Sequence, residues 1–222
     1  SKILVPRFTR KESRKFFKVL NSRVNKYFNE NKLSKTGNWR LYGKTVIMFA
    51  ILIAPYILII SLDISDLFKL FLSIVTGIGM AGVGMNVMHD GNHGSFSKYD
   101  WVNKIMGGSI YILAGNVFNW KVQHNVLHHT FTNVHGHDED LEAGKILRFS
   151  KHSKWMPHHR FQHLYSVFLY GLLTINWAIF ADFIQLIRYQ KRNLSYVNSR
   201  SPKTQWVILI VSKLIYFTIW LV

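Results

Sequence analysis

The sequence predicts an all-α protein, built as a multi-pass transmembrane helical bundle with a cytoplasmic histidine-rich cap and interfacial helices. Of its 222 residues, 49% are hydrophobic, and these gather into long blocks with few charges rather than spreading evenly along the chain. Strongly basic segments separate the blocks, and two histidine clusters each follow an apolar block directly. We therefore treat residues 1–222 as a single membrane domain.

The N-terminal segment, residues 1–42, is rich in lysine and arginine. Within it, residues 8–30 have the apolar spacing of an amphipathic helix. The residues that carry this spacing are Phe16, Phe17, Leu20, Val24, Tyr27 and Phe28. A basic amphipathic helix can lie on a membrane surface or pack against the rest of the protein, and the sequence favours neither. The excess of cations places this segment on the cytoplasmic side.

Two apolar blocks, residues 45–62 and 67–88, are long enough to cross a bilayer as helices. The first runs outward, an acidic turn at residues 63–66 lies outside, and the second returns inward. This path delivers His89 to the cytoplasmic face. The second block also contains four glycines, which allow close helix packing in lipid or leave room for an acyl chain.

Residues 105–118 are apolar but too few to span, so we expect a re-entrant or interfacial segment. Residues 119–163, polar and histidine-rich, then remain cytoplasmic. The last two apolar segments, residues 164–187 and 206–222, are membrane-associated, although the basic residues between them leave it open whether the first crosses. Lys213 lies near the centre of the last segment, where a charge is costly unless it snorkels or faces a cavity.

The net charge of +17 in a soluble protein would suggest nucleic acid. Here the cations flank membrane segments, so we expect no nucleic-acid partner but attraction to the head groups of a lipid bilayer. The chain contains no cysteine, which excludes disulfides, thiolate zinc sites and cysteine-held iron–sulfur clusters. We expect a multi-pass protein of the bacterial cytoplasmic membrane, with its active site facing the cytoplasm.

The two histidine clusters predict a metal centre, because histidine is the commonest metal-ligating side chain. The runs HDGNH and HNVLHH contain His89, His93, His124, His128 and His129. Two histidines four residues apart share one face of a helix, about 6 Å apart. The adjacent His128 and His129 point about 100° apart on a helix. That divergence favours two metal ions over one, and the spacing alone does not exclude zinc.

Metal-ligating histidines usually donate their second ring N–H to a carboxylate or carbonyl. Three acids close to the clusters, Asp90, Asp138 and Asp140, are candidates for this role, and each is also compatible with a solvated loop. Among the remaining histidines, His163 is a candidate neighbour of the centre. No catalytic residue is expected beyond the metal ligands. Trp120 is expected to be an interfacial anchor, with lining of a substrate tunnel as the alternative.

The stretches HDGNHGSF, WKVQHNVLHHTFTNVHGHDEDLE and RFQHLYS resemble the membrane fatty acid desaturase family, in particular its bacterial acyl-CoA or acyl-lipid, linoleoyl-CoA-like front-end branch. This resemblance covers most of the chain. It implies two iron ions at the cytoplasmic face, with His89 and His93 as the first histidine box and His124, His128 and His129 as the second. It also implies O₂ as co-substrate and a fatty acyl-CoA or acyl-lipid whose acyl chain gains a double bond.

Three features differ from the family pattern. A third histidine box is absent, and we expect it beyond Val222 because the chain ends within an apolar run. The second box has three residues before its histidine pair, where many eukaryotic relatives have two. No HPGG haem-binding motif is present, so the electron donor is expected to be a separate ferredoxin or cytochrome-b5-type protein with its reductase. Lipid hydroxylation by the same irons and non-catalytic metal or lipid binding remain alternatives.

Overall fold

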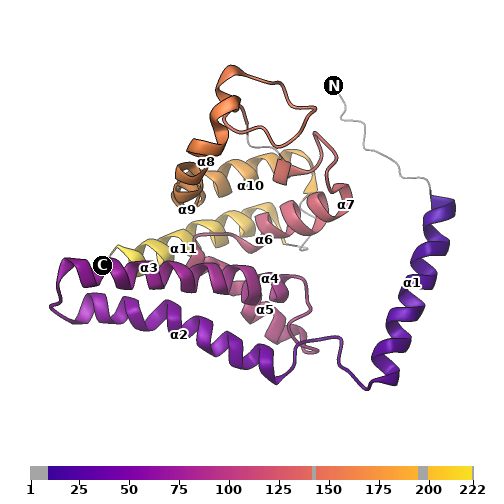
Figure 1. The fold of residues 1–222 in the computed structure, drawn as a ribbon, viewed down its shortest axis with the longest axis horizontal. Helices are drawn as coiled ribbons and strands as arrows, with labels where there is room; N and C mark the ends of the chain where they lie inside the picture. Colours follow the sequence, from indigo (N-terminus) through magenta and orange to yellow (C-terminus); the bar gives the residue numbers. More distant parts are fainter. Residues whose placement is uncertain (1–9, 142–143, 195–199, 222) are drawn as a thin grey trace.

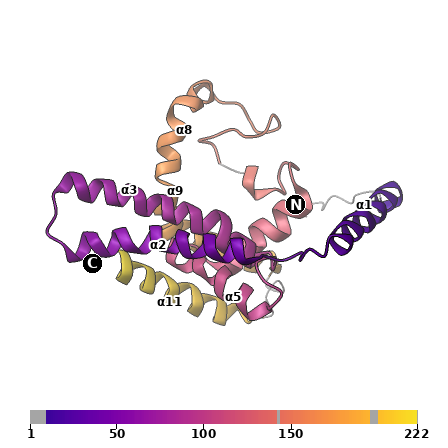
Figure 2. The same cartoon turned by 60° about the horizontal axis from the view of Figure 1, so that its bottom comes forward.

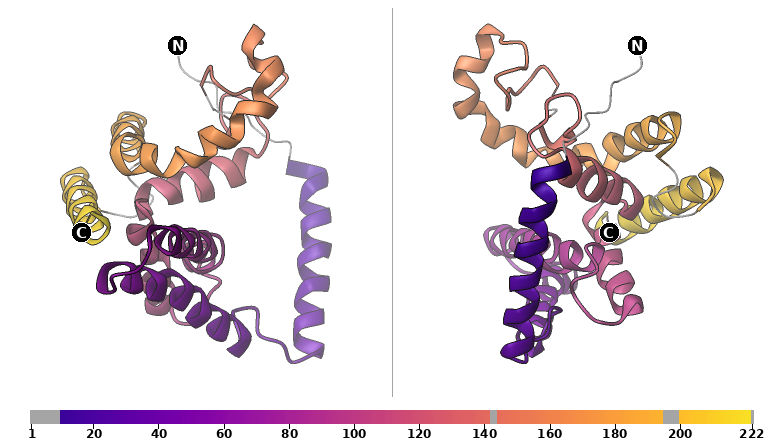
Figure 3. Two further views of the ribbon diagram at one scale, coloured as in Figure 1. Left: turned by 60° about the vertical axis from the view of Figure 1, so that its left-hand side comes forward. Right: turned by 90° about the vertical axis from the view of Figure 1, so that its right-hand side faces the viewer.

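The computed structural model describes residues 10–141, 144–194 and 200–221. Within these ranges every regular element is a helix and no strand occurs, so the all-α prediction is confirmed. Helix α1 (Arg10–Glu30) stands away from the remaining helices (Figures 1 and 3). Its side chains from Arg14 onward are exposed apart from the partly buried Phe28. Residues 8 and 9 of the predicted amphipathic helix lie outside the described residues.

Helices α2 (Trp39–Ser61) and α3 (Asp66–Gly82) form an antiparallel hairpin (Figure 1). Each begins at a side-chain cap, since Asn38 accepts bonds from the first backbone N–H groups of α2 and Ser65 does so for α3. Their close approach requires Gly79, because a Cβ atom there would lie 2.5 Å from the backbone nitrogen of Leu52. One of the four glycines noted in the sequence therefore serves helix packing.

Helix α3 continues without a break into the π-helix η1 (Val83–Met88) and helix α4 (His89–Asn92). Within the described part of the chain, two stretches are long and apolar enough to cross a membrane, Trp39–Ser61 and Asp66–Asn92. A third crossing is possible if the bent pair Pro157–Gly171 and Leu173–Lys191, which meet at 56°, acts as one span.

The predicted re-entrant segment, residues 105–118, is not one straight helix. It comprises the end of α5 (Asp100–Gly108), a 3₁₀ turn η2 (Ser109–Leu113) and the start of α6 (Val117–Trp120). Between the last two, Ala114 adopts a left-handed conformation with φ of 68°, which reverses the chain. The π-helix η3 (Lys121–His128) and α7 (His129–Phe131) follow α6 directly.

The remaining elements form the second half of the structure. The 3₁₀ turns are η4 (Glu139–Leu141) and η5 (Pro157–Phe161), followed by α8 (Gln162–Gly171), α9 (Leu173–Asn176), the π-helix η6 (Trp177–Ala181), α10 (Asp182–Lys191) and α11 (Pro202–Trp220). The end of α11 returns to α2 (Figure 2), where the Trp220 and Tyr56 rings lie 4.7 Å apart.

Two apolar clusters lie behind the two histidine-bearing helices. One joins η1 to α2 and α5 through residues that include Val83, Val87, Leu52 and Val102. The other joins η3 to α10 and α11 through residues that include Val122, Leu127, Leu186 and Leu209. Each histidine-bearing helix is thus fixed from behind, which leaves its opposite face free to meet the other.

Candidate metal centre

The five histidines of the two clusters converge on one place, although they come from three different helices. The ring of His89, in α4, lies 4.5 Å from the ring of His93, which caps the C-terminal end of that helix. The His93 ring lies 5.2 Å from that of His124 in η3 and 4.9 Å from that of His129 in α7. The His128 ring is 5.3 Å from His124, in a nearly parallel stack.

The nitrogen and oxygen atoms at this site fall into two groups. Ligand atoms of His89, His93 and His124 all lie within 4.8 Å of one another, and so do those of His128, Asp138 and Asp140. The His129 ring lies 4.7 Å from that of His124, closer than the 5.5 Å that separates it from His128. His129 belongs to neither group of ligand atoms, but its ring lies beside the first group, whereas His128 lies with the two acids.

A π-helix precedes or contains each histidine cluster. The turn η1 ends immediately before His89, and η3 holds both His124 and His128. Insertions of this kind re-aim the side chains that follow, and they occur frequently at functional sites. Neither π-helix was predicted from the sequence, because the apolar and histidine spacing fits an α-helix equally well.

Hydrogen bonds join the two histidine-bearing segments. The side chain of Asn125 in η3 donates to the backbone oxygen of Asn92, and Asn92 donates to the backbone oxygen of Gly107, at 3.1 and 3.0 Å. Gly91 makes this contact possible, because a Cβ atom there would lie 2.4 Å from the backbone nitrogen of Gly107. The HDGNH sequence thus carries the packing residues of the site between its two histidines.

Carboxylate oxygens lie within hydrogen-bonding distance of the Nδ1 atoms of two histidines. Asp90 is 3.2 Å from Nδ1 of His89, and Asp138 is 3.0 Å from Nδ1 of His128. Asp140 is 3.2 Å from the same atom of His128. The structure therefore places all three acids that the sequence singled out against histidines of the cluster. His163, by contrast, is exposed in α8 and forms no ring contact or ion pair with the cluster in the described part of the chain.

Asp138 is 1% exposed and is held as a carboxylate. Burial alone would raise its pKa, but the backbone N–H of Asn133, the His128 ring and the backbone N–H of Asp140 all bond to it and hold the pKa below its ordinary value. An ionised carboxylate against Nδ1 favours the tautomer that carries its proton there. Nε2 of His128 is then available for a metal.

The loop that carries these acids is fastened to α10 by contacts that no local sequence pattern indicates. Glu139 accepts hydrogen bonds from Arg188, Tyr189 and Arg192, at 2.8, 2.6 and 3.1 Å. On the η3 side, Gln123 donates to Asp140 at 2.8 Å. These partners lie far apart in the sequence, so their pairing follows only from the fold.

Trp120 packs against the cluster, with its ring 4.5 Å from that of His124 and 5.5 Å from that of His93. It therefore borders the centre, and its expected role as an interfacial anchor stays a prediction. The remaining histidines include His158 and His159, whose rings both approach the backbone oxygen of Lys145. That contact holds their own loop together.

The histidine donors fit a divalent metal. Burial first, and then the neighbouring His129 ring, lowers the pKa of His124 to about 4, so this imidazole is neutral at physiological pH. Burial and the charges of His89 and His129 likewise lower the pKa of His93. The Nε2 atom of His124 is buried without a hydrogen-bond partner. A buried ring nitrogen of a neutral imidazole, without a hydrogen-bond partner, is the ligand atom that iron or another imidazole-binding metal requires.

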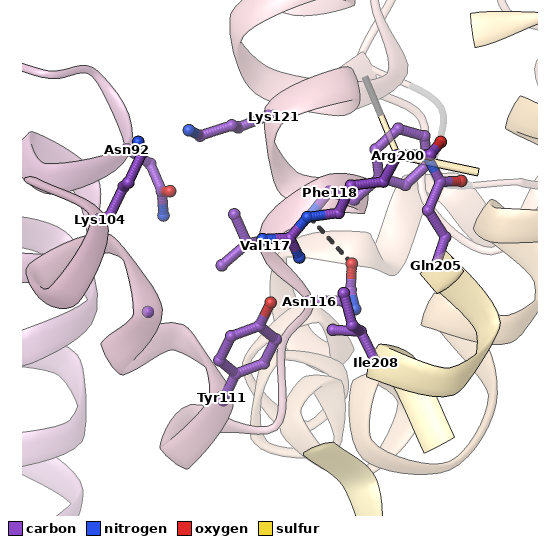
Figure 4. Close-up of a pocket in the computed structure, with 11 residues that line it drawn as sticks. Asn92, Lys104, Tyr111, Asn116, Val117, Phe118, Lys121, Arg200, Gln205 and Ile208 are labelled. Atoms are coloured by element: carbon purple, nitrogen blue, oxygen red, sulfur yellow. Dashed lines mark hydrogen bonds between the residues drawn. The ribbon is translucent and has the colours of Figure 1, made fainter. Parts of the chain in front are cut away.

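A cavity of about 580 Å³ adjoins the centre (Figure 4). It is bordered by Asn92, which precedes His93, and by Lys121, which lies one turn before His124. Three cationic side chains, Lys104, Lys121 and Arg200, line it together with Tyr111, Phe118 and Ile208. None of the five histidines is among the residues that line this cavity, whose wall is partly cationic and partly apolar.

These features define a helical protein with two membrane-length helices and a histidine-rich candidate metal centre at the end of the second. A model of the fatty acid desaturase family matches residues 65–222. The chain belongs to the fatty acid desaturase family, as its histidine motifs predicted.

Curated relatives carry desaturase names. The chain is 35% identical to the sn-1 linoleoyl-lipid 6-desaturase of Arthrospira platensis over 86% of its own length and 51% of that relative. It is 33% identical to the acyl-lipid (8-3)-desaturase of Physcomitrium patens, covering 78% and 36% of the two chains. The chain is 31% identical to the sn-1 linoleoyl-lipid 6-desaturase of Synechocystis, over 81% of its own length and 50% of that relative. No solved structure gives a significant match. The chain spans about half the length of the Arthrospira and Synechocystis relatives and 36% of the length of the Physcomitrium relative.

Proposed function

We propose that this chain forms part of an iron-dependent, O₂-dependent desaturase that introduces a double bond into the acyl chain of a lipid. The observation that carries the proposal is the convergence of five histidines, including a buried His124 nitrogen without a partner, in a member of the desaturase family. His89, His93, His124, His128 and His129 would hold two iron ions. When bound, this iron pair supplies the oxidising power that removal of hydrogen from an unactivated methylene demands.

The surrounding residues have defined tasks in this proposal. Asp90 and Asp138 orient the His89 and His128 rings by accepting their Nδ1 protons, at 3.2 and 3.0 Å. Glu139 fixes the loop that carries Asp138 to α10. Trp120 covers the His93 and His124 rings and limits the access of water to them.

The substrate we propose is an acyl-lipid, since the named relatives act on linoleoyl-lipids or acyl-lipids. As the source of electrons we propose a ferredoxin or cytochrome-b5-type protein with its reductase. We place the centre on the cytoplasmic side of a bacterial membrane, because the basic N-terminal segment and the histidines lie at the same end of the α2–α3 hairpin.

The test is the fatty acid profile of a bacterial host that expresses the complete gene together with a competent electron donor. We expect a new unsaturated fatty acid that disappears in a His128→Ala variant. A His152→Ala variant is the matched control, because its ring is exposed outside the cluster, and it should retain the product. A hydroxy fatty acid in place of the unsaturated product would show that the reaction is hydroxylation and not desaturation. An unchanged profile with folded, iron-loaded protein would contradict the proposal.

A further inference from the structure

A lysine of α2 is joined to an asparagine of the π-helix η1, just before the first histidine cluster. Nζ of Lys44 donates a hydrogen bond to Oδ1 of Asn86 at 2.7 Å, although the two residues are 42 positions apart. Asn86 in turn donates from Nδ2 to the backbone oxygen of Gly82 at 2.9 Å. Through one amide group, α2 is therefore tied to the turn that ends immediately before His89, in the hairpin where α2 and α3 run side by side (Figure 1).

Lys44 determines which way round the amide of Asn86 points. An ammonium group donates hydrogen bonds and accepts none, so the amide must turn its oxygen toward Nζ and its NH₂ group toward the helix. Both side chains are partly buried, where a polar group without a partner is costly. This arrangement gives each of them a partner.

The bond from Asn86 to Gly82 favours a π-helical turn. In an α-helix the backbone oxygen of Gly82 would accept from the backbone N–H of Asn86, four residues later. The side-chain NH₂ group occupies the same acceptor, and side-chain bonds of this kind compete with the backbone bonds of a helix. Thr76 makes a similar bond to the backbone oxygen of Leu72 within regular α3. What distinguishes Asn86 is its tie to Lys44.

The π-helical turn decides where the following histidines point. Each residue of an α-helix rotates the side-chain direction by about 100°, so an additional residue in one turn redirects all later side chains by that amount. On the opposite face of η1, Val83 and Val87 are fully buried against α2 and α5, which resists rotation of the turn. His89 and His93 are thereby aimed at His124, whose ring lies 5.2 Å from each of theirs.

We propose that Asn86, oriented by Lys44, is the positioning residue of the first histidine cluster. It stabilises the π-helical turn that aims His89 and His93 at the second cluster, and it acts through the backbone rather than as a metal ligand. The inference rests on the proposed function for its purpose, the holding of metal. The aim of the histidines is nevertheless measurable in metal-free protein.

That aim is tested with a short thiol-reactive cross-linker. His93→Cys combined with His129→Cys places two thiols at side chains whose rings lie 4.9 Å apart, and the 222 residues contain no other cysteine. Linked peptides from the metal-free complete protein in neutral detergent are quantified by mass spectrometry. Adding Asn86→Leu, which keeps the side-chain size but removes both bonds, should lower the yield at least about fivefold, the effect of one lost hydrogen bond on an equilibrium. Thr76→Val is the matched control, because it removes the bond to Leu72 from the same span, and it should leave the yield unchanged.

The part assigned to Lys44 is tested in the same assay. Lys44→Met removes the donor and should lower the yield as Asn86→Leu does. Lys44→Arg keeps a positively charged donor and should retain the yield of the parent. An unchanged yield in Asn86→Leu would overturn the proposal, and an unchanged yield in Lys44→Met would overturn the orienting role of Lys44.

The consequence for metal binding is measured with Co²⁺ and the complete protein with all its histidines. We expect Asn86→Leu to raise the Kd for Co²⁺ about 10- to 100-fold while its unfolding temperature stays equal to that of Thr76→Val. Equal Co²⁺ affinity in these two variants would overturn the positioning role. So would a loss of affinity accompanied by a lower unfolding temperature, because Asn86 would then only stabilise the fold.

Failure of the proposed function would look different. An unmodified protein that binds no metal, although its thiol variant is cross-linked, would contradict the metal centre. The cross-linking yields of Asn86→Leu and Thr76→Val would still decide whether Asn86 aims the histidines.

Discussion

Lys213, near the middle of α11, donates a hydrogen bond of 2.7 Å to the carboxylate of Asp182 in α10, and the two residues are 5% and 1% exposed. Lys213 also donates to the backbone oxygens of Ala114 and Trp177, and Asn119 donates to Asp182. Two charges in apolar segments are thus neutralised by each other. Through Asn119, the pair fixes the helix that immediately precedes the second histidine cluster.

We predict that Lys213→Met lowers the free energy of unfolding by about 3–5 kcal/mol, because it leaves Asp182 buried without its partner. The double variant Asp182→Leu with Lys213→Met should recover most of this loss, since it removes both charges. The measurement is thermal and denaturant unfolding in neutral detergent, with the amount of folded monomer read by fluorescence-detected size exclusion. A Lys213→Met protein as stable as the unmodified one would contradict the pair's importance.

The sequence predicted the helical class and the five histidines because those signals are local. Four-residue spacing places His89 and His93 together on one helix, whatever lies elsewhere. The partner of Lys213 was not predictable, since Asp182 is 31 positions away and only the packing of α10 on α11 brings them together. His163 is exposed near the start of α8, and residue spacing alone does not encode its distance from the cluster.

Asp138→Asn is expected to reduce iron affinity about 10- to 100-fold, because the neutral amide binds the Nδ1 proton of His128 less strongly than the carboxylate does. The measurement is iron bound per chain at a series of free Fe²⁺ concentrations under anaerobic conditions. Asp100→Asn is the control, as that carboxylate is exposed and pairs with Lys104 outside the cluster. Equal iron affinity in the two variants would rule out orientation of His128 by Asp138.

Glu139→Gln should loosen the loop that carries Asp138. The variant weakens the bonds from Arg188, Tyr189 and Arg192, and because both arginines are partly exposed we expect a loss of only about 1–2 kcal/mol. Hydrogen–deuterium exchange of residues 133–141 should become about fivefold to thirtyfold faster. Glu30→Gln, which removes an exposed pair with Lys26, should leave exchange in this loop unchanged. An unaltered loop in Glu139→Gln would show that other contacts hold it.

Gly91→Ala should separate α4 from α5, because its added methyl group would lie 2.4 Å from the backbone nitrogen of Gly107. Overpacking of this kind costs about 1–3 kcal/mol and would displace His89 and His93. We expect a lower unfolding temperature and weaker iron binding. Gly108→Ala is the control, since no heavy atom lies within 4 Å of its added methyl group. Similar behaviour of the two variants would contradict a close-packing role for Gly91.

The most direct test of the central claim, that the converging histidines hold two irons, is the iron content of the complete protein loaded anaerobically with Fe²⁺ and analysed by Mössbauer spectroscopy. We predict about two iron ions per chain, with nitrogen-rich ligation, in the unmodified protein. A His124→Ala variant that remains folded should bind fewer than one, because it removes the buried nitrogen shared by the first group of ligands. Full iron content in His124→Ala, or no specific iron in the unmodified protein, would contradict the account.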